Sequence, residues 1–344
     1  MKIAIIGAGI SGLTAGIELK NAGHGVMIYE KSRGYGGRMA TRYAENDKTL
    51  KLDHGVPYVS AESDEFRFLL KELYEENILE EWKSKIIKKD LKDAPLKHYS
   101  NLEKFYAPDG MNSIGKYLGK DLDIRFSEKV NRIDHAQKTD RKGHIWTLNC
   151  ESGNTVKADA VIISAPAPQT IALLKTAGKK TEISGLIHDL EAVSYDPQFA
   201  MMLTYSHKDL SDWGIIEVDD DIIKFISNES KKRDLRKDAL VVHSTFEFAS
   251  KNLEKDRDVI LDVMSERMTS LLGEWAALPD WKQLHFWRYS QTRDTLPHDF
   301  LEISGNGTPL ALVGSYMKGK TVETAYLSGL KLGKHWARQL PAKK

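Results

Sequence analysis

The 344-residue sequence lacks several features that mark particular classes of protein. A single cysteine, Cys150, excludes a disulfide framework and favours a reducing compartment. Lysine and arginine number 50 and aspartate and glutamate 49, so the formal charge of +1 gives no sign of nucleic-acid binding. The 11 histidines show no His-x-x-x-His spacing and Cys-x-x-Cys is missing. We therefore expect no metal site.

Long apolar runs are missing as well. The sequence holds no run of about 18 or more apolar residues and predicts no membrane span. The N-terminal segment IAIIGAGISGL follows a lysine, as in a signal peptide, but its interspersed glycines and its continuation into a polar helix argue against one. We expect a soluble cytoplasmic protein, and its length favours two domains.

The clearest positive feature is a glycine-rich turn near the N-terminus. An unbroken apolar run at 3–6 is typical of a buried parallel strand, and a helical pattern begins near Ser11. Between them Gly7 permits a tight turn, Gly9 lets a pyrophosphate approach the backbone, and Gly12 lets the helix pack on the strand. This spacing predicts a dinucleotide site with the diphosphate at the helix N-terminus.

The segment after the second predicted strand indicates whether the dinucleotide is NAD or FAD. Glu30 ends that strand, where a carboxylate accepts ribose hydroxyls in both NAD and FAD sites. An NAD dehydrogenase normally enters another helix here, whereas this chain enters SRGYGGRMATR (32–42). We expect this loop to supply further backbone donors and Arg38 to reach the phosphates. LDHGVPY (52–58) would then follow the far end of the cofactor, which predicts FAD; a flexible basic surface loop is the alternative.

These residues also carry a family resemblance. EKSRGYGGRMATR followed by LDHGVPYVS resembles the renalase branch of the flavin-containing amine oxidase superfamily. The first motif is shared by many flavoproteins, and later segments are more specific to the branch. Similar segments recur in order over nearly the whole chain, at 106–114, 190–205, 223–234, 240–245 and 286–292.

The resemblance implies an α/β fold: a Rossmann-type FAD-binding domain with a discontinuous second α+β substrate domain, as in amine oxidases and p-hydroxybenzoate hydroxylase. We assign 1–58, 106–168 and 286–344 to the FAD-binding domain. The remaining segments, 59–105 and 169–285, are assigned to the substrate domain, whose sheet should cover the flavin ring.

Several local patterns predict individual elements. Alternation at 123–136 predicts one strand, and 146–168 predicts a hairpin that leads into a buried strand. ALVVHSTFEF (239–248) is read as a strand of the second sheet. Cys150 lies in the hairpin, away from any flavin-tethering position, so we expect non-covalent FAD.

The residues expected to bind FAD combine the glycine turn with what the resemblance implies. Val130 would offer backbone contacts to the adenine, and the helix from about Thr321 would aim its dipole at the flavin. Ser315 departs from the family, which usually has Asp there to hold the ribityl chain. The full set is Gly7, Gly9, Ile10, Ser11, Gly12, Glu30, Lys31, Gly37, Arg38, Met39, His54, Gly55, Val130, Ala165, Gly314, Ser315, Val322 and Ala325.

The substrate pocket is predicted from the resemblance alone. It comprises Tyr58, His243, Trp287 and Arg288. Judged from the residues themselves, His243 could instead be a hydrogen-bonded core histidine and Trp287 a core residue. No nucleophile motif or pair of catalytic carboxylates is evident.

The resemblance implies an oxidase that transfers hydride from an isomeric dihydro-NAD(P) to the flavin N5 and passes the electrons to O2, giving NAD(P)+ and H2O2. Positioning of the ring would then supply most of the rate, without a certain catalytic side chain. Two alternatives stay open: an amine oxidase or desaturase of the same fold, and a flavin-binding sensor without turnover. Fold and cofactor do not decide among these.

Overall fold

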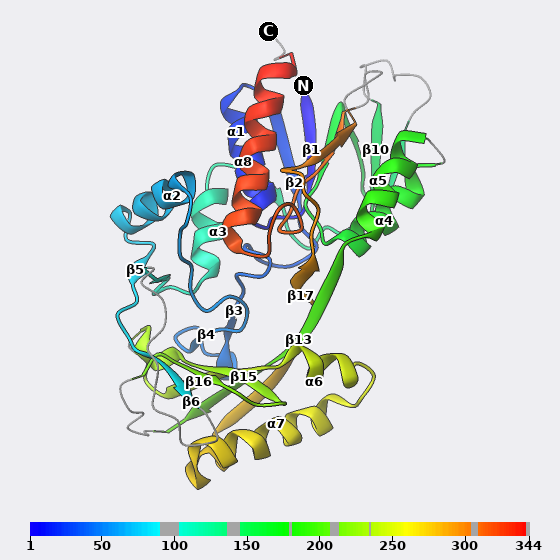
Figure 1. The fold of residues 1–344 in the computed structure, drawn as a ribbon. Helices are drawn as coiled ribbons and strands as arrows, with labels where there is room; N and C mark the ends of the chain where they lie inside the picture. Colours follow the sequence, from blue (N-terminus) through cyan, green and yellow to red (C-terminus); the bar gives the residue numbers. More distant parts are fainter. Residues whose placement is uncertain are drawn as a thin grey trace.

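The computed structural model describes residues 1–89, 103–135, 145–178, 181–206, 213–233, 235–303 and 309–341. The molecule has two halves, each built around a six-stranded sheet (Figure 1). The N-terminus and the last described residues of the chain lie at the end of the first half that is farthest from the second half.

The sheet of the first half has the order β18-β19-β12-β1-β2-β8. Its central strands pair in parallel, and β18 joins β19 antiparallel. Both faces are covered, which is why its strands are almost continuously apolar. The bounds are β1 (Lys2–Ile6), β2 (Gly25–Tyr29), β8 (Asp123–Arg125), β12 (Ala160–Ile163), β18 (Leu301–Ile303) and β19 (Leu310–Leu312).

One face of this sheet carries α1 (Ile10–Asn21) and α8 (Val322–Gln339), which pack closely together. A side chain at Gly329 would collide with the Ser11 backbone. The close approach therefore depends on this glycine and sets α8 beside the turn that follows β1.

The other face carries a three-stranded sheet and two helices. They are β9 (Val130–His135), β10 (Trp146–Cys150), β11 (Thr155–Ala158), α4 (Ala167–Leu174) and α5 (Thr181–Glu191). The predicted hairpin and buried strand over 146–168 are confirmed as β10, β11 and β12.

The prediction of one strand at 123–136 was wrong. The segment forms β8 in the first sheet and β9 in the three-stranded sheet. Ser127, with a φ of 54°, turns the chain between them. Alternating polarity continues through this turn, so the pattern did not reveal the break; Ala136 lies outside the described residues.

The sheet of the second half has the order β17-β13-β16-β15-β14-β6. Its two longest strands, β13 and β17, extend from the second half into the first (Figure 1). The bounds are β6 (Ile86–Lys89), β13 (Ser194–Tyr205), β14 (Ile215–Val218), β15 (Ile223–Asn228), β16 (Asp238–Ser244) and β17 (Trp281–Asp294).

The strand predicted at 239–248 ends earlier than expected. β16 stops at Ser244, and the Thr245 side chain accepts a hydrogen bond from the Phe248 N–H to cap α6 (Phe246–Lys251). Aromatic residues suit a strand, but this N-cap starts a helix instead.

The two faces of the second sheet have different neighbours. α6 and α7 (Arg257–Leu272) cover one face, against Phe199 and Val242. The other face meets the hairpin of β3 (Thr41–Tyr43) and β4 (Lys51–Asp53), where Leu52 packs on Met202 and Val241. We call this second face, which carries Met202, Val241, His243, His285 and Trp287, the junction face.

Packing divides the chain somewhat differently from the predicted domains, whose boundaries stay a prediction. α2 (Asp64–Glu75) packs in the core of the first half, with Phe66 against Tyr326, although β6 joins the second sheet. α4 and α5 also pack with the first half. The amphipathic pattern over 65–82, with Leu69, Leu70 and Leu73 on one face, indicates a helix packed on a core; the helix ends at Glu75, and the pattern does not show which core it enters.

The remaining described elements are short. They are α3 (Asn112–Gly119), β5 (Glu80–Glu81), β7 (Phe105–Tyr106) and 3-10 turns at Ala44–Asn46, Lys175–Ala177, Glu229–Lys231 and Glu274–Ala277. Within the described part of the chain, no helix has the length and apolar character needed to cross a membrane.

Candidate active site

The turn between β1 and α1 has the geometry of a phosphate-binding loop. Gly7 has a φ of 108°, and its N–H donates to the Tyr29 carbonyl at 2.9 Å. A Cβ on Gly12 would collide with the Gly7 carbonyl, whereas a Cβ on Gly9 would meet no atom within 4 Å. The turn is thus closed where it packs on the protein and open at Gly9, where a pyrophosphate would approach.

Glu30 is 8% exposed and is held by backbone donors. Its Oε2 accepts from the Ala8 N–H at 2.8 Å, and its Oε1 accepts from the Ser32 N–H at 2.7 Å. A carboxylate oxygen has a further lone pair, so both can still accept a ribose hydroxyl. Glu30 therefore fits the predicted role and also supports the turn, which the sequence did not indicate.

The loop after β2 lies against the glycine turn. Gly36 and Gly37 have φ values of 96° and 57°. The Gly36 N–H donates to the Ala8 carbonyl at 3.2 Å, and a Cβ on Gly37 would lie 3.5 Å from the Gly9 Cα. The two glycine segments consequently bring backbone together beside the open space at Gly9; that this loop supplies donors to the cofactor stays a prediction.

Arg38 is a part-buried cation with neutral partners. It donates from Nη2 to Ser315 Oγ at 2.6 Å and from Nη1 to the Ser290 carbonyl at 3.3 Å. Burial lowers the pKa of Arg38, and no described carboxylate pairs with it. A guanidinium with spare donors and uncompensated charge fits a diphosphate.

Ser315 is buried and also lies 3.1 Å from Thr292 Oγ1. The serine that departs from the family pattern therefore accepts from Arg38. An aspartate there would pair with that charge; serine leaves it available.

The other predicted FAD residues lie around the same turn or at strand and helix ends. Ile10 and Ser11 begin α1, Ala165 follows β12, and Gly314 follows β19. Val322 and Ala325 lie in the first turn of α8, which Thr321 caps. A side chain on Gly55 would collide with the Arg38 carbonyl, so Gly55 runs beside the loop.

Three of the predicted residues would contact a cofactor through backbone or not at all. The side chains of Met39 and Val130 are buried in the two cores of the first half. Lys31 is exposed, and its Nζ donates to Gln169 at 3.1 Å.

Cys150 is buried in the core beside β9, and burial raises its pKa to about 11, which disfavours a thiolate that could tether a flavin.

His54 connects the cofactor side to the junction face. Its carbonyl accepts from Trp287 Nε1 at 2.8 Å and lies 3.3 Å from His243 Nε2. Because a carbonyl only accepts, the His243 proton resides on Nε2. Burial lowers the pKa of His243 to about 3, so it is neutral at pH 7.

A cluster of flat rings surrounds this contact. The His54 ring stacks on Trp287 with centroids 5.4 Å apart, and His285 lies edge-on to both, at 4.8 Å and 4.4 Å. Burial and the Arg42 charge lower the pKa of His285 to about 4, and burial, His285 and Arg42 lower that of His54 to about 3. His285 was missed, although its spacing of two from Trp287 places both on one face of a strand.

The structure separates the other two predicted pocket residues from this cluster. Arg288 is exposed and its guanidinium lies 5.6 Å from the Phe286 ring, which packs on the α7 side of the sheet. Adjacent residues of a strand point to opposite faces, so Arg288 does not join Trp287. Tyr58 is half-buried beside Trp82, with ring centroids 5.8 Å apart.

Four buried charges join the two halves next to His54. Asp53 and Glu229 are completely buried, as is the Lys232 side chain, and Arg233 nearly so. Lys232 Nζ lies 2.7 Å from Glu229 and 3.4 Å from Asp53, and Arg233 contacts the same two carboxylates at 3.1 Å and 2.7 Å. The charges of this cluster, which we call the buried quartet, sum to zero.

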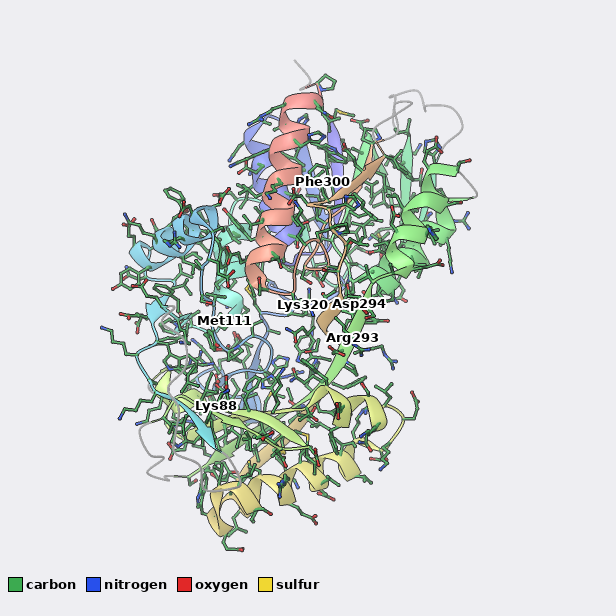
Figure 2. All side chains as sticks on the ribbon, viewed as in Figure 1. Lys88, Met111, Arg293, Asp294, Phe300 and Lys320 are labelled. Carbon is green, nitrogen blue, oxygen red and sulfur yellow. The ribbon has the colours of Figure 1, made fainter. Side chains whose placement is uncertain are left out.

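Backbone donors complete the buried quartet. Asp53 Oδ1 accepts from the Met111 N–H at 2.9 Å, and Glu229 Oε2 accepts from the Asp53 N–H at 3.0 Å. Burial acts to raise the pKa of Asp53, but Arg233 and Lys232 outweigh it and hold the pKa low. Figure 2 shows Met111 and Arg293 at the level where the halves meet. The quartet thus holds the segment that carries His54 against the second sheet.

Comparison with known proteins agrees with this geometry. A family model described as NAD(P)-binding Rossmann-like domain matches residues 5–73. Mouse (Mus musculus) renalase is 25% identical over 313 residues, covering 86% of each chain. A 4,4'-diapophytoene desaturase of Staphylococcus aureus is 54% identical, but over 39 residues, 11% of this chain and 8% of its own.

Solved structures resemble the chain over its full length. Putrescine oxidase bound to putrescine has a TM-score of 0.72 at 12% identity, covering 100% of both chains. Cyclohexylamine oxidase from Brevibacterium oxydans IH-35A has a TM-score of 0.72 at 12% identity, covering 98% of this chain and 99% of that one. These likenesses show the fold.

The family follows from the model that covers most of the chain. The description flavin containing amine oxidoreductase matches residues 96–332, well over half of the sequence. The open glycine turn, Glu30 and Arg38 fit the dinucleotide of FAD. This protein is an FAD-dependent oxidoreductase that belongs to the flavin-containing amine oxidoreductase family.

Proposed function

We propose that this protein oxidises an isomeric dihydro-NAD(P) to NAD(P)+ and reduces O2 to H2O2. The similarity to mouse renalase over 86% of the chain supports this branch of the family. Bound FAD would supply the two-electron acceptor. The described side chains would bind and orient the substrate ring.

The observation that carries the proposal is the neutral ring cluster of His54, His285 and Trp287. Flat neutral rings suit stacking against a planar pyridine ring. A histidine whose pKa is lowered to about 3 or 4 is a weak base at pH 7. An ammonium must lose a proton before oxidation, whereas a dihydropyridine does not, so this cluster suits the dihydropyridine better.

Anaerobic mixing of the purified holoprotein with a panel of donors tests the proposal. Isomeric dihydronicotinamides should bleach the flavin rapidly near neutral pH, without a strong rise toward high pH. Ordinary β-NADH should be slow, because its reactive hydrogen is on another ring carbon and a misplacement of about 1 Å can cost on the order of a hundredfold. Air should then restore the colour with about one peroxide per substrate.

The full-length likeness to putrescine oxidase supports an amine oxidase as the second candidate. Rapid bleaching by simple amines, increasing with pH, would favour it and contradict the dihydropyridine proposal. Bleaching by none of the donors in FAD-loaded protein would instead favour a sensor without turnover.

A further inference from the structure

Arg42 lies on the hairpin side of the junction, next to the ring cluster. In the β3–β4 hairpin it is directly opposite Leu52, whose side chain packs on Met202 and Val241 of the second sheet. Directly opposed residues of an antiparallel pair project to the same face. The Arg42 side chain therefore projects toward the junction face, whose outer strand is β17.

The guanidinium of Arg42 has a buried donor without an acceptor. Its Nε is buried and has no hydrogen-bond partner, and within the described residues it forms no ion pair. A buried donor without a partner is costly, and native proteins rarely leave one. An acceptor from a ligand would remove this cost.

Nearby groups do not neutralise Arg42. Its charge acts on both His54 and His285, whose rings are uncharged at pH 7 because burial lowers their pKa. The carboxylate of Asp53, the next residue after the Leu52 that pairs with Arg42, is already occupied by Lys232, Arg233 and the Thr41 hydroxyl. Among the residues that the structure describes, Arg42 is thus a positive charge without a counter-ion beside a wall of flat rings.

We propose that Arg42 binds the phosphate of a substrate whose ring lies against His54 and Trp287. This inference rests on the proposed function and extends it, because it specifies a phosphorylated nucleotide over an unphosphorylated nucleoside or a simple amine. A guanidinium suits this task since its planar donors match two phosphate oxygens. Arg38, which donates to Ser315 and lies beside the glycine turn, remains available for the cofactor diphosphate.

Two ligands that differ only in a phosphate test the proposal without turnover. Calorimetric titration of the FAD-loaded protein with nicotinamide mononucleotide and with nicotinamide riboside gives the affinity ratio. The mononucleotide should bind about tenfold to a hundredfold more tightly, the ratio expected for charge-assisted hydrogen bonds. Arg42→Met should abolish this ratio with little change for the riboside, and Arg42→Lys should retain part of it.

Arg288→Met is the matched control, because it removes an exposed arginine from the opposite face of β17. It should keep the wild-type ratio, and flavin content and melting temperature should match the wild type in all three variants. An equal affinity of the two ligands in the wild type, or a phosphate preference that survives Arg42→Met, overturns the proposal. Loss of FAD from Arg42→Met also overturns it and assigns the residue to the cofactor.

These outcomes are separate from those of the oxidase proposal. The titrations use oxidised ligands and read binding alone, whereas the oxidase proposal is read from flavin bleaching. A phosphate preference without bleaching by dihydronicotinamides would retain the Arg42 site and reject the oxidase. Bleaching by dihydronicotinamides without a phosphate preference would support the oxidase proposal and reject the Arg42 phosphate site.

Discussion

The glycine turn and the junction between the halves differ in the groups that they offer to a ligand. The turn offers backbone: Gly9 and Gly37 lie beside open space, and Glu30 is fixed by two N–H donors. The junction offers side chains: the buried quartet of charges, which includes the residue before His54, and the neutral rings that His54 contacts. Most side-chain substitutions at the turn leave its backbone donors in place, whereas the junction depends on every side-chain partner being present.

The buried quartet should show the largest effect on stability. Lys232→Met leaves two buried carboxylates with Arg233 alone, and breaking a buried pair typically costs about 3–5 kcal/mol. Urea unfolding of the variant measures this loss. Lys129→Met, which removes an exposed pair with Glu151, is the control and should cost less than about 1 kcal/mol. Similar losses in the two variants would mean that the quartet does not hold the halves together.

The neutral histidines should make the protein sensitive to acid. The pKa values of His54 and His243, each lowered to about 3 from 6.5, are below those of the unfolded chain, so unfolding takes up protons. Stability is therefore full above about pH 6.5 and falls as the pH drops, by about 1.4 kcal/mol per pH unit for each histidine.

His243→Gln should reduce this slope in urea unfolding between pH 6.5 and 5, and the exposed His298→Gln should not. A wild-type slope near zero in this range would show that these histidines are charged in the folded protein.

Removal of the Glu30 carboxylate should weaken the cofactor at the turn. Glu30→Ala loses charge-assisted hydrogen bonds of about 1.5–3 kcal/mol, and FAD affinity should fall roughly tenfold to a hundredfold. Fluorescence titration of the apoprotein with FAD measures the dissociation constant. Glu30→Gln should recover part of the affinity, since one amide oxygen still accepts. An unchanged FAD dissociation constant in Glu30→Ala would mean that Glu30 supports the turn and does not bind the cofactor.

The smallest effect should come from Arg288. The family resemblance placed Arg288 in the substrate pocket, but its exposed position on the opposite face leads us to expect that Arg288→Ala changes the rate of flavin reduction by less than about twofold. Trp287→Ala removes the donor to the His54 carbonyl and should slow reduction by roughly ten- to a hundredfold through misplacement of the ring. Stopped-flow bleaching compares them, and a slower Arg288→Ala would return this residue to the pocket.

The sequence predicted the elements whose signals are local. The turn at Gly7, the helix capped by Thr321 and the hairpin at 146–158 each depend on neighbouring residues, and all three are present. The wrong element boundaries arose where one sequence pattern continued past the end of a secondary-structure element. Ser127 turns the chain inside an alternating segment, and Thr245 caps a helix inside an aromatic one.

The candidate site likewise has one part that local sequence patterns predicted and one part that they did not. Gly9, Glu30 and Arg38 come from one short stretch, so their spacing was enough to predict a dinucleotide site. The ring cluster combines His54 with residues of a strand more than two hundred positions later. Strict alternation along β17 would have paired His285 with Trp287 and excluded Arg288, but strand register and the choice of face require the sheet.

By itself the sequence determined the nucleotide-binding turn, because glycine spacing and apolar runs act within a few residues of one another, and segments along nearly the whole chain carried the family resemblance. The tertiary structure alone decided which charges neutralise each other and which stay free. Asp53 is bound by Lys232 and Arg233, while Arg42, eleven positions before it, has no described counter-ion. Electrostatic pairing depends on distance in space and on burial, and the pairing of β13 with β17 and the docking of the hairpin set both.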